Sequence, residues 1–313
     1  MGIPIIDIAS PDAPSEVDRA GREWGFLAVV NHGVDDVVLA NSWNDARLFF
    51  DLAEPEKMSV AMPFAGYPYG YSPIAGETLS RSTGRQSLPD RKESFAIGPV
   101  DPPSHRFADD DEEFAWSQNL WPTQIPRLRD SWTTRYRALS SLADRLLRTM
   151  ATSLDLPNRH FSPLIDRHTS AMRAINYPGN CPNGGHIEDG WGASPHTDYG
   201  TLTILEVDPI EPGLEVQLPD GSWIDVMPPV GSLVVNLGDA MERWTNHRWR
   251  STMHRVRRPL GRRQSIAFFH NANWDAVIEC IPSCLRPGES PRYEPILAGP
   301  HLMQKFKSTV NPY

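Results

Sequence analysis

The spacing of apolar and polar residues in the first part of the chain alternates between strand-like and helix-like patterns. Residues 3–8 (IPIIDI) and 25–33 (GFLAVVNHG) are short apolar runs that predict strands, the second closed by an Asn-His-Gly turn. Residues 13–24 between them predict a helix. Residues 35–51 also have helical spacing, with acidic residues in the first turn. We therefore expect this region to combine strands with flanking helices.

Three segments in the middle of the chain differ in composition. Residues 63–77 (PFAGYPYGYSPIAGE) are rich in glycine, proline and tyrosine, which predicts a long loop able to act as a lid. The acidic residues 109–113 (DDDEE) are interpreted as a solvated connection. Apolar residues then recur every three or four positions from Leu128 to Leu146, which predicts one long amphipathic helix over residues 125–154.

From about Thr169 the pattern changes to short strand candidates separated by turn residues. Many short strands at this spacing favour a sandwich or a barrel over a parallel sheet. The segment LPDGSW adds an Asp-Gly hairpin signal. No G-x-G-x-x-G or P-loop pattern opens a helix, so nucleotide-binding folds are disfavoured. The strand candidates are SAMRAINYP, GTLTILEV, LEVQLPDGSWIDV, GSLVVNLGD, STMHRVRRP and QSIAFFHNAN.

Composition and charge exclude several classes of protein. The 313 residues carry a formal net charge of −9, which argues against nucleic acid as a partner because phosphate binding needs a basic surface. No apolar stretch approaches the roughly 20 residues of a membrane helix, and the first residues lack a secretion signal. Cys181, Cys280 and Cys284 fit neither a metal finger nor a disulfide framework. We expect a cytoplasmic protein with no membrane partner, and the oligomeric state is open.

The stretch WGASPHTDYGTLTILEV holds a histidine and an aspartate two positions apart. In an extended strand, alternation would place His196 and Asp198 on one face. Because a buried carboxylate must be paired or metal-bound, they form either a hydrogen-bonded pair or two corners of a metal site. His247 and His254 are both candidates for a third ligand. We favour His254, because it lies in the strand-like STMHRV.

Two histidines and one carboxylate on one side of an ion are the donor set of non-haem Fe(II) oxygenases. The same donors suit zinc, so a zinc hydrolase stays open. A non-catalytic jelly-roll protein that binds a metal or ligand is the alternative from a different class.

A second group of candidates follows His254 along the chain. In RQSIAFF, alternation places Arg263, Ser265, Ala267 and Phe269 on one face of a strand. An arginine that points into a barrel needs an anionic partner, and its planar fork matches a carboxylate. Ser265 would add a hydroxyl donor beside it, and Tyr177 in INYP could supply another. The alternative is that Arg263 is a surface charge within a basic run.

Taken together, PHTDYGTLTIL, STMHRV and RRQSIAFFHNANWD resemble the isopenicillin N synthase-like family of iron/2-oxoglutarate-dependent oxygenases. The segments IPIIDI, WGFLAVVNHGV, GYSPIAGE, DRKESFAIGP, AVIECIPSC and YEPILAG extend the resemblance over nearly the whole chain. It implies a mainly β core with flanking helices, folded as a double-stranded β-helix, a cupin-like jelly-roll barrel. It also implies His196, Asp198 and His254 as iron ligands, Arg263 and Ser265 as the pair that binds the distal carboxylate of 2-oxoglutarate, and Tyr177 as an assisting residue.

The sequence departs from the family pattern in one place. The family frequently has an asparagine two residues before the tyrosine, whereas this chain has Ile175 there and Asn176 next to the tyrosine. This departure puts any role for Asn176 in doubt.

The resemblance implies a 2-oxoglutarate-dependent dioxygenase that hydroxylates, desaturates or cyclises a small-molecule metabolite. Fe(II) would be its cofactor, 2-oxoglutarate and O2 its co-substrates, and ascorbate its reductant in vitro, with release of succinate and CO2. Two alternatives in the same fold stay open. One is an oxidase that takes all its electrons from the substrate, and the other is a fragmentation enzyme of the ethylene-forming type.

The resemblance also suggests four segments and a set of substrate-contacting candidates. The segments are an N-terminal dioxygenase region (1–104), a linker with the long helix (105–164), the jelly-roll core (165–275) and a C-terminal segment packing on it (276–313). Arg173 shares the face of Tyr177 by alternation and would hold either a carboxylate or phosphate of the substrate or a structural acid. The substrate candidates are Phe269, Tyr199, Arg173, Glu77, Tyr71 and Asn271.

Overall fold

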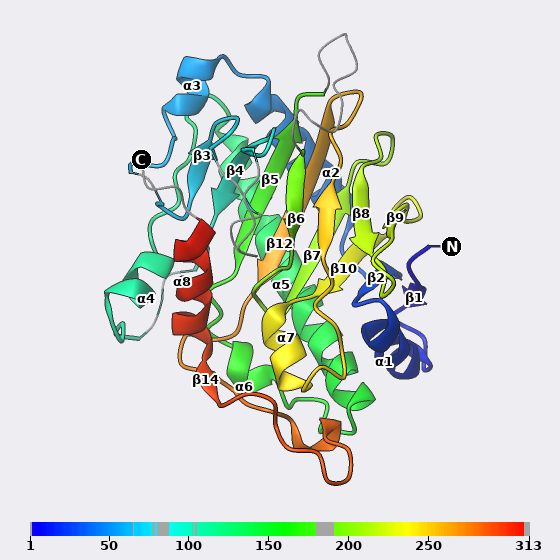
Figure 1. Cartoon of the computed structure of the whole chain (residues 1–313). Coiled ribbons are helices and arrows are strands. Elements are labelled where there is room, and N and C mark those ends of the chain that lie inside the picture. Colours follow the sequence, from blue (N-terminus) through cyan, green and yellow to red (C-terminus); the bar gives the residue numbers. More distant parts are fainter. Residues whose placement is uncertain are drawn as a thin grey trace.

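The computed structural model describes residues 2–64, 66–76, 79, 88–101, 103, 105–179 and 191–309, and a large sheet forms its centre (Figure 1). Eight strands form this sheet in the order β1-β2-β10-β7-β12-β5-β4-β3. Strands β1 and β2 are parallel, and the other neighbours are antiparallel. The strands are β1 (Ile5–Asp7), β2 (Phe26–Val30), β3 (Gly70–Ser72), β4 (Glu93–Ile97), β5 (Ala171–Tyr177), β7 (Leu202–Val207), β10 (Leu233–Leu237) and β12 (Arg263–His270).

A second, four-stranded sheet faces the first and closes the barrel. Its order is β6-β11-β8-β9, and β8 and β9 form the hairpin that the Asp-Gly signal predicts. Its inward residues Leu214 and Val256 pack with Phe26 and Ile175 of the large sheet in one buried cluster. The predicted double-stranded β-helix is thereby confirmed. The strands are β6 (Ala193–His196), β8 (Leu214–Gln217), β9 (Trp223–Asp225) and β11 (His254–Val256), and a separate pair is β13 (Val277–Ile278) with β14 (Ile296–Leu297).

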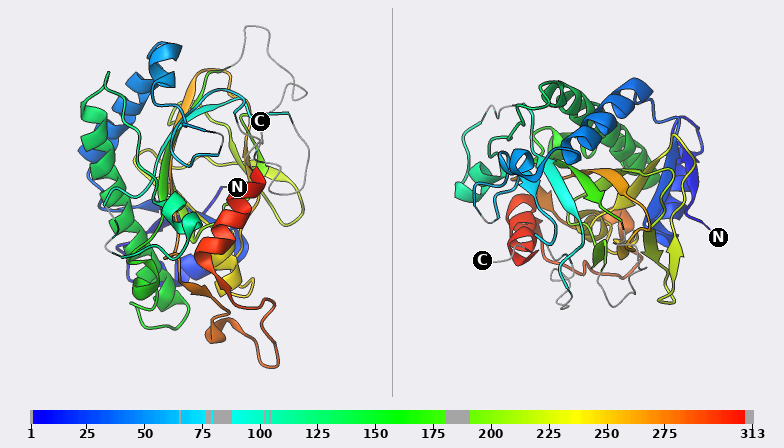
Figure 2. Two further views of the ribbon diagram at one scale, coloured as in Figure 1. Left: turned by 90° about the vertical axis from the view of Figure 1, so that its left-hand side faces the viewer. Right: turned by 90° about the horizontal axis from the view of Figure 1, so that it is seen from above.

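Helices cover the outer face of the large sheet, opposite the small sheet (Figure 2). Phe49 of α2 and Leu139 of α5 pack there in one core cluster with Phe268 of β12. The predicted helices over residues 35–51 and 125–154 are therefore present and amphipathic. The helices are α1 (Ala13–Glu23), α2 (Asp36–Phe50), α3 (Glu54–Met58), α4 (Asp110–Ala115), α5 (Arg127–Ser153), α6 (Ser162–Ile165), α7 (Asp239–Trp244) and α8 (Ala298–Thr309), with a 3-10 turn at Pro282–Cys284.

Strand β12 shows how the sequence separates the two faces of the large sheet. Ile266 and Phe268 point outward into the core beneath the helices. Arg263, Ser265 and Phe269 alternate with them and line a cavity inside the barrel. The strand therefore carries its apolar anchors on one face and its polar chemistry on the other.

The acidic run at residues 109–113 is mostly solvent-exposed, as its composition predicts, but it is helical rather than an irregular connection. It begins helix α4, where the Asp109 side chain accepts a hydrogen bond from the Glu112 backbone N–H. Acidic side chains in a first helical turn are stabilised by the helix dipole. Glu112 is buried and accepts hydrogen bonds from the Ala108 backbone and the His105 ring. The run therefore starts a helix and anchors it.

Within the described residues, every helix is too short or too polar to cross a lipid bilayer.

Candidate metal centre and adjoining chamber

The small sheet brings two histidines together inside the barrel. His196 is the last residue of β6 and His254 is the first residue of β11, and the two are directly paired across these antiparallel strands. Their ring centroids are 4.3 Å apart. Phe26 packs edge-on against the His254 ring at 5.3 Å, which restricts that ring's orientation. Strand pairing therefore places the two imidazoles side by side inside the barrel.

Asp198 completes the group, although strand alternation does not place it there. It lies after the end of β6, in the connection that leads into β7 of the large sheet. Its Oδ1 is 4.0 Å from His196 Nε2 and 3.8 Å from His254 Nε2. The expectation that one strand carries His196 and Asp198 on a shared face is wrong, because the chain crosses between the two sheets at this point.

Hydrogen bonds aim the three candidate ligand atoms at one another. The Nδ1 atoms of His196 and His254 lie 2.7 and 3.1 Å from the backbone carbonyls of Ser194 and Thr252, so each must carry the proton that it donates. In the neutral ring, this arrangement leaves the lone pair on Nε2, the atom that faces the other two residues. Within the part of the chain that the structure describes, one ligand atom from each of the three residues lies within 4.8 Å of the others.

The opposite oxygen of Asp198 is held by two further polar side chains. Thr203 donates its hydroxyl to Asp198 Oδ2 at 2.6 Å, and Asn236 donates its amide N–H to the same atom at 2.7 Å. Both donors are buried and come from neighbouring strands, β7 and β10. These two bonds orient Asp198 so that its Oδ1 faces the histidines. Residues behind a metal ligand commonly orient it by hydrogen bonds of this kind.

The electrostatics of the cluster favour the protonation states that a divalent metal requires. Burial and the neighbouring His254 lower the pKa of His196 to about 3. Burial alone would raise the pKa of Asp198, but the two histidines and the hydrogen bonds from Thr203 and Asn236 bring it below its ordinary value. At neutral pH the site presents a neutral His196 and an ionised Asp198, which suits a divalent ion.

Replacing Asn236 with alanine is expected to weaken divalent-metal binding by about 10–100-fold, because Asp198 loses one of the two bonds that orient it. Titration with Mn(II), which needs no reductant, would measure the change. Asn41→Ala on the exposed side of α2 is the matched control and should bind Mn(II) like the wild type. Equal affinities in the two variants would show that Asn236 has no orienting role.

Arg263 lies deeper in the same cavity, with 1% of its surface exposed. Its guanidinium carbon lies 5.0 Å from the centre of the Tyr177 ring, the residue paired with it on β5. No described residue accepts a hydrogen bond from its Nε or Nη1. A buried guanidinium with orphaned donors fits a carboxylate ligand, because its fork otherwise bears an uncompensated desolvation cost. Ser265, also buried, is the next inward residue of β12.

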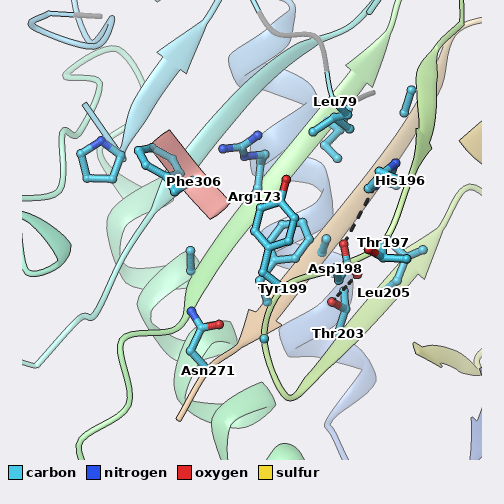
Figure 3. A pocket seen from close by; sticks show the side chains of 18 of the residues that line it. Leu79, Arg173, His196, Thr197, Asp198, Tyr199, Thr203, Leu205, Asn271 and Phe306 are labelled. Atoms are coloured by element: carbon cyan, nitrogen blue, oxygen red, sulfur yellow. Dashed lines mark hydrogen bonds and ion pairs between the residues drawn. The ribbon is translucent and has the colours of Figure 1, made fainter. Parts of the chain in front are cut away.

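A chamber of about 260 Å³ extends from the metal-ligand candidates and Arg263 toward α4 and α8. The close-up shows Arg173, Tyr199 and Phe306 in this chamber, with His196 and Asp198 across from them (Figure 3). Its volume suits a small molecule. The sequence candidates that line the chamber are Tyr177, Arg263, Ser265, Phe269, Tyr199, Arg173 and Asn271, together with the three candidate ligands.

Other candidates lie elsewhere. Tyr71 is in strand β3, which interrupts the predicted loop at residues 63–77, and its hydroxyl donates to Glu93 at 2.6 Å rather than lining the chamber. Asn176 faces away from the barrel and also donates to Glu93. His247 lies beside Tyr293, away from the metal-ligand candidates. Glu77 falls outside the described residues.

Asn236 and Thr203 were missed by the sequence interpretation. A signal for Asn236 exists, since it is the one polar residue in the apolar run LVVNL of β10. A polar residue at an inward position of a buried strand needs a partner. Thr203 carries no such signal, because threonine is common in strands.

Two family models match the chain. The 2OG-Fe(II) oxygenase superfamily matches residues 169–272, which contain the three candidate ligands and Arg263. The non-haem dioxygenase in morphine synthesis N-terminal family matches residues 3–124. The two matches together span most of the chain.

Individual proteins and solved structures are also similar to this chain over nearly its whole length. A 2-oxoglutarate-Fe(II) type oxidoreductase from Emericella nidulans is 33% identical, over 91% of this chain and 81% of the relative. A homoarginine-6-hydroxylase from Oryza sativa subsp. japonica is 33% identical, over 97% of this chain and 96% of its own. The crystal structure of a full-length Neurospora crassa protein in complex with alpha-KG and thymine has a TM-score of 0.85 at 26% identity, covering 98% of this chain and 96% of that one.

Proposed function

Because the chain belongs to the 2OG-Fe(II) oxygenase superfamily, we propose that His196, Asp198 and His254 hold its Fe(II). We further propose that Arg263 and Ser265, with Tyr177 beside them, bind the distal carboxylate of 2-oxoglutarate. The protein is an Fe(II)/2-oxoglutarate-dependent dioxygenase that oxidises a small molecule with release of succinate and CO2. Its cofactor is Fe(II), and its co-substrates are 2-oxoglutarate and O2.

The roles proposed for these residues rest on two polar groups that lie in one cavity and that a ligand would complete. The first is a set of three neighbouring ligand atoms with ordered hydrogen bonds behind them. The second is the buried Arg263 guanidinium with two orphaned donors. A keto acid that spans the two groups would complete both, since one end can chelate a metal and the other can accept from arginine.

The chain's own residues orient the reaction and keep water away. Iron, when bound, supplies the oxidising chemistry, which protein side chains lack. Arg263 sets the position of the distal carboxylate, and its burial strengthens this ion pair. Thr203 and Asn236 hold Asp198 so that one oxygen stays directed at the metal position. The apolar walls of the chamber exclude water from a reactive centre.

Finer assignments form part of the same proposal. We place the chain in the isopenicillin N synthase-like branch, supported by the match of residues 3–124 to a dioxygenase N-terminal family. We propose the same four segments that the sequence suggests: an N-terminal region (1–104), a linker with the long helix (105–164), the jelly-roll core (165–275) and a C-terminal segment (276–313). Strands β5 to β12 all lie within the proposed core, which supports its boundaries. A cytoplasmic location is supported by the free thiols Cys280 and Cys284.

Anaerobic addition of 2-oxoglutarate to the Fe(II) protein tests the proposal. A visible metal-to-ligand charge-transfer band should appear, and admission of O2 with ascorbate should release succinate slowly, and faster when a substrate is present. A protein that binds iron but gives neither the band nor succinate would refute the proposed roles. An oxidase that takes all its electrons from the substrate would oxidise that substrate without consuming 2-oxoglutarate.

A further inference from the structure

The strand that carries His196 contains a β-bulge just before that residue. His196 of β6 pairs with His254 of β11, but the next pair lies three residues back along β6 and only two residues on along β11. Ser194 and Pro195 therefore share one position opposite β11. A bulge of this kind bends its strand and changes the direction of the side chains beside it. The geometry of the bulge thus helps to set the direction of His196.

Ser194, within the bulge, connects His196 to a buried carboxylate. Its carbonyl accepts a hydrogen bond from His196 Nδ1 at 2.7 Å, and its backbone N–H donates to Asp90 Oδ1 at 2.9 Å. Ser194 and Asp90 are 0% and 1% exposed, so water from the surface does not replace either bond. Through one residue of backbone, the Asp90 carboxylate therefore acts on the ring of a candidate ligand.

Asp90 is itself held in one orientation. The Leu79 backbone N–H donates to its Oδ2 at 3.2 Å, and the Lys92 ammonium lies 3.8 Å from the same oxygen. These contacts direct Oδ1 toward Ser194. Leu79 and His196 both line the chamber, and the close-up labels both (Figure 3). The two oxygens of Asp90 thus join the chamber wall to the strand that carries His196.

The same carboxylate fastens the two sheets to each other. Among the described strands, β6 is the outermost of the small sheet, and residues 90–92 lead directly into β4 of the large sheet. The Arg91 N–H donates to the Trp191 carbonyl at 2.9 Å, so the segment before β4 runs beside the segment before β6. An edge strand has a neighbouring strand on one side only. Asp90 therefore anchors an edge strand to the start of a strand in the other sheet.

We propose that Asp90 is a positioning residue for the metal site: by holding the Ser194 backbone, it fixes the bulge that directs His196 Nε2 toward Asp198 and His254. The proposal rests on the proposed function, in which these three side chains hold Fe(II). Without Asp90, the Ser194 N–H would lose a buried acceptor, and the bulge would rearrange to replace that bond. The His196 ring would turn with the Ser194 carbonyl that orients it.

Three variants at position 90 separate the hydrogen bond from the charge. Asp90→Ala removes the acceptor and should weaken Mn(II) binding about tenfold, the low end of the range for residues that act behind a metal ligand. Asp90→Asn keeps an oxygen that can accept from the Ser194 N–H, and it should bind Mn(II) like the wild type. Asp90→Ser keeps a polar group that is too short to reach that N–H, and it should behave like Asp90→Ala. Titration of the folded proteins with Mn(II) measures all three.

A spectrum of the bound metal distinguishes positioning from a loss of stability. Co(II) in the same site absorbs visible light at energies that depend on the arrangement of its ligands. With the site saturated, Asp90→Ala and Asp90→Ser should shift these bands, whereas Asp90→Asn should keep the wild-type spectrum. A merely structural role would lower the free energy of unfolding, measured by urea titration, and would leave the spectrum of the folded protein unchanged.

Asp45→Ala is the matched control, because Asp45 is also a buried carboxylate with two partners. It lies on α2, outside the barrel, and accepts hydrogen bonds from Arg127 and Ser131. This variant should lose stability but keep the wild-type Mn(II) affinity and Co(II) spectrum. Equal losses of affinity in Asp45→Ala and Asp90→Ala would show that affinity follows stability, and would overturn the proposal.

Three further results would also overturn it. In the first, Asp90→Ala keeps both the Mn(II) affinity and the Co(II) spectrum of the wild type. In the second, Asp90→Asn loses as much affinity as Asp90→Ala, which would assign the effect to the charge. In the third, neither Asp90→Ala nor Asp90→Ser folds, which would make Asp90 a structural residue. A wild-type protein that binds neither metal would instead refute the proposed function.

Discussion

Replacing His254 with alanine is expected to abolish 2-oxoglutarate-dependent succinate release by weakening Fe(II) binding more than about 100-fold. The loss of an outer hydrogen-bond partner already costs about 10–100-fold in metal affinity, and the loss of a ligand should cost more. The two remaining groups, His196 and Asp198, would present only two of the three converging ligand atoms. Anaerobic Fe(II) titration and succinate measurement would both record the effect.

His247 offers a matched control for this prediction, because the sequence alone leaves it as an alternative ligand. It lies beside Glu242 and Tyr293 rather than in the barrel. Its backbone has φ of 63°, a region that asparagine tolerates, so His247→Asn removes the imidazole with little strain. This variant should keep iron binding and turnover. Turnover that survives in His254→Ala, or iron binding lost in His247→Asn, would contradict the ligand assignment.

Most of the strands and helices could be predicted from the sequence because each contains its own pattern. Strand β12 alternates apolar anchors with inward polar residues, and α5 repeats apolar residues every three or four positions. The acidic run of α4 is mostly exposed, as predicted, but its composition does not reveal that Asp109 caps a helix or that Glu112 is buried. A run of charged residues predicts exposure to solvent. Whether one of them caps a helix or is buried depends on the segments that pack against it.

The sequence indicated which residues form the candidate site, but it indicated only part of the geometry that brings them together. The spacing of His196 and Asp198 marks the pair, but they converge because the chain passes from one sheet to the other, which no local pattern encodes. The pairing of His196 with His254 across β6 and β11 is a contact between distant segments. The Tyr71 hydroxyl bonds Glu93 for the same reason, as β3 pairs with β4. Long-range pairing therefore accounts for what sequence periodicity missed.

Replacing Arg263 with methionine is expected to raise the dissociation constant of 2-oxoglutarate by tens to thousands of times. Removal of one partner from a buried charged pair costs about 2–5 kcal/mol, which corresponds to that range. Fe(II) binding should change little, because the three candidate ligands come from other residues. Arg262→Met is the neighbouring control: Arg262 points outward to Asp51 and Asn176 and should leave 2-oxoglutarate binding unchanged.

The same Arg263→Met variant separates ligand binding from a structural role through its stability without 2-oxoglutarate. The buried guanidinium has two donors that no described residue satisfies, so the folded protein carries a desolvation cost in the absence of a ligand. Methionine removes that cost and packs well in an apolar site. The free energy of unfolding, measured by urea titration without 2-oxoglutarate, should therefore be equal to or above that of the wild type. A destabilised variant that still binds 2-oxoglutarate tightly would make Arg263 a structural residue and refute its proposed role.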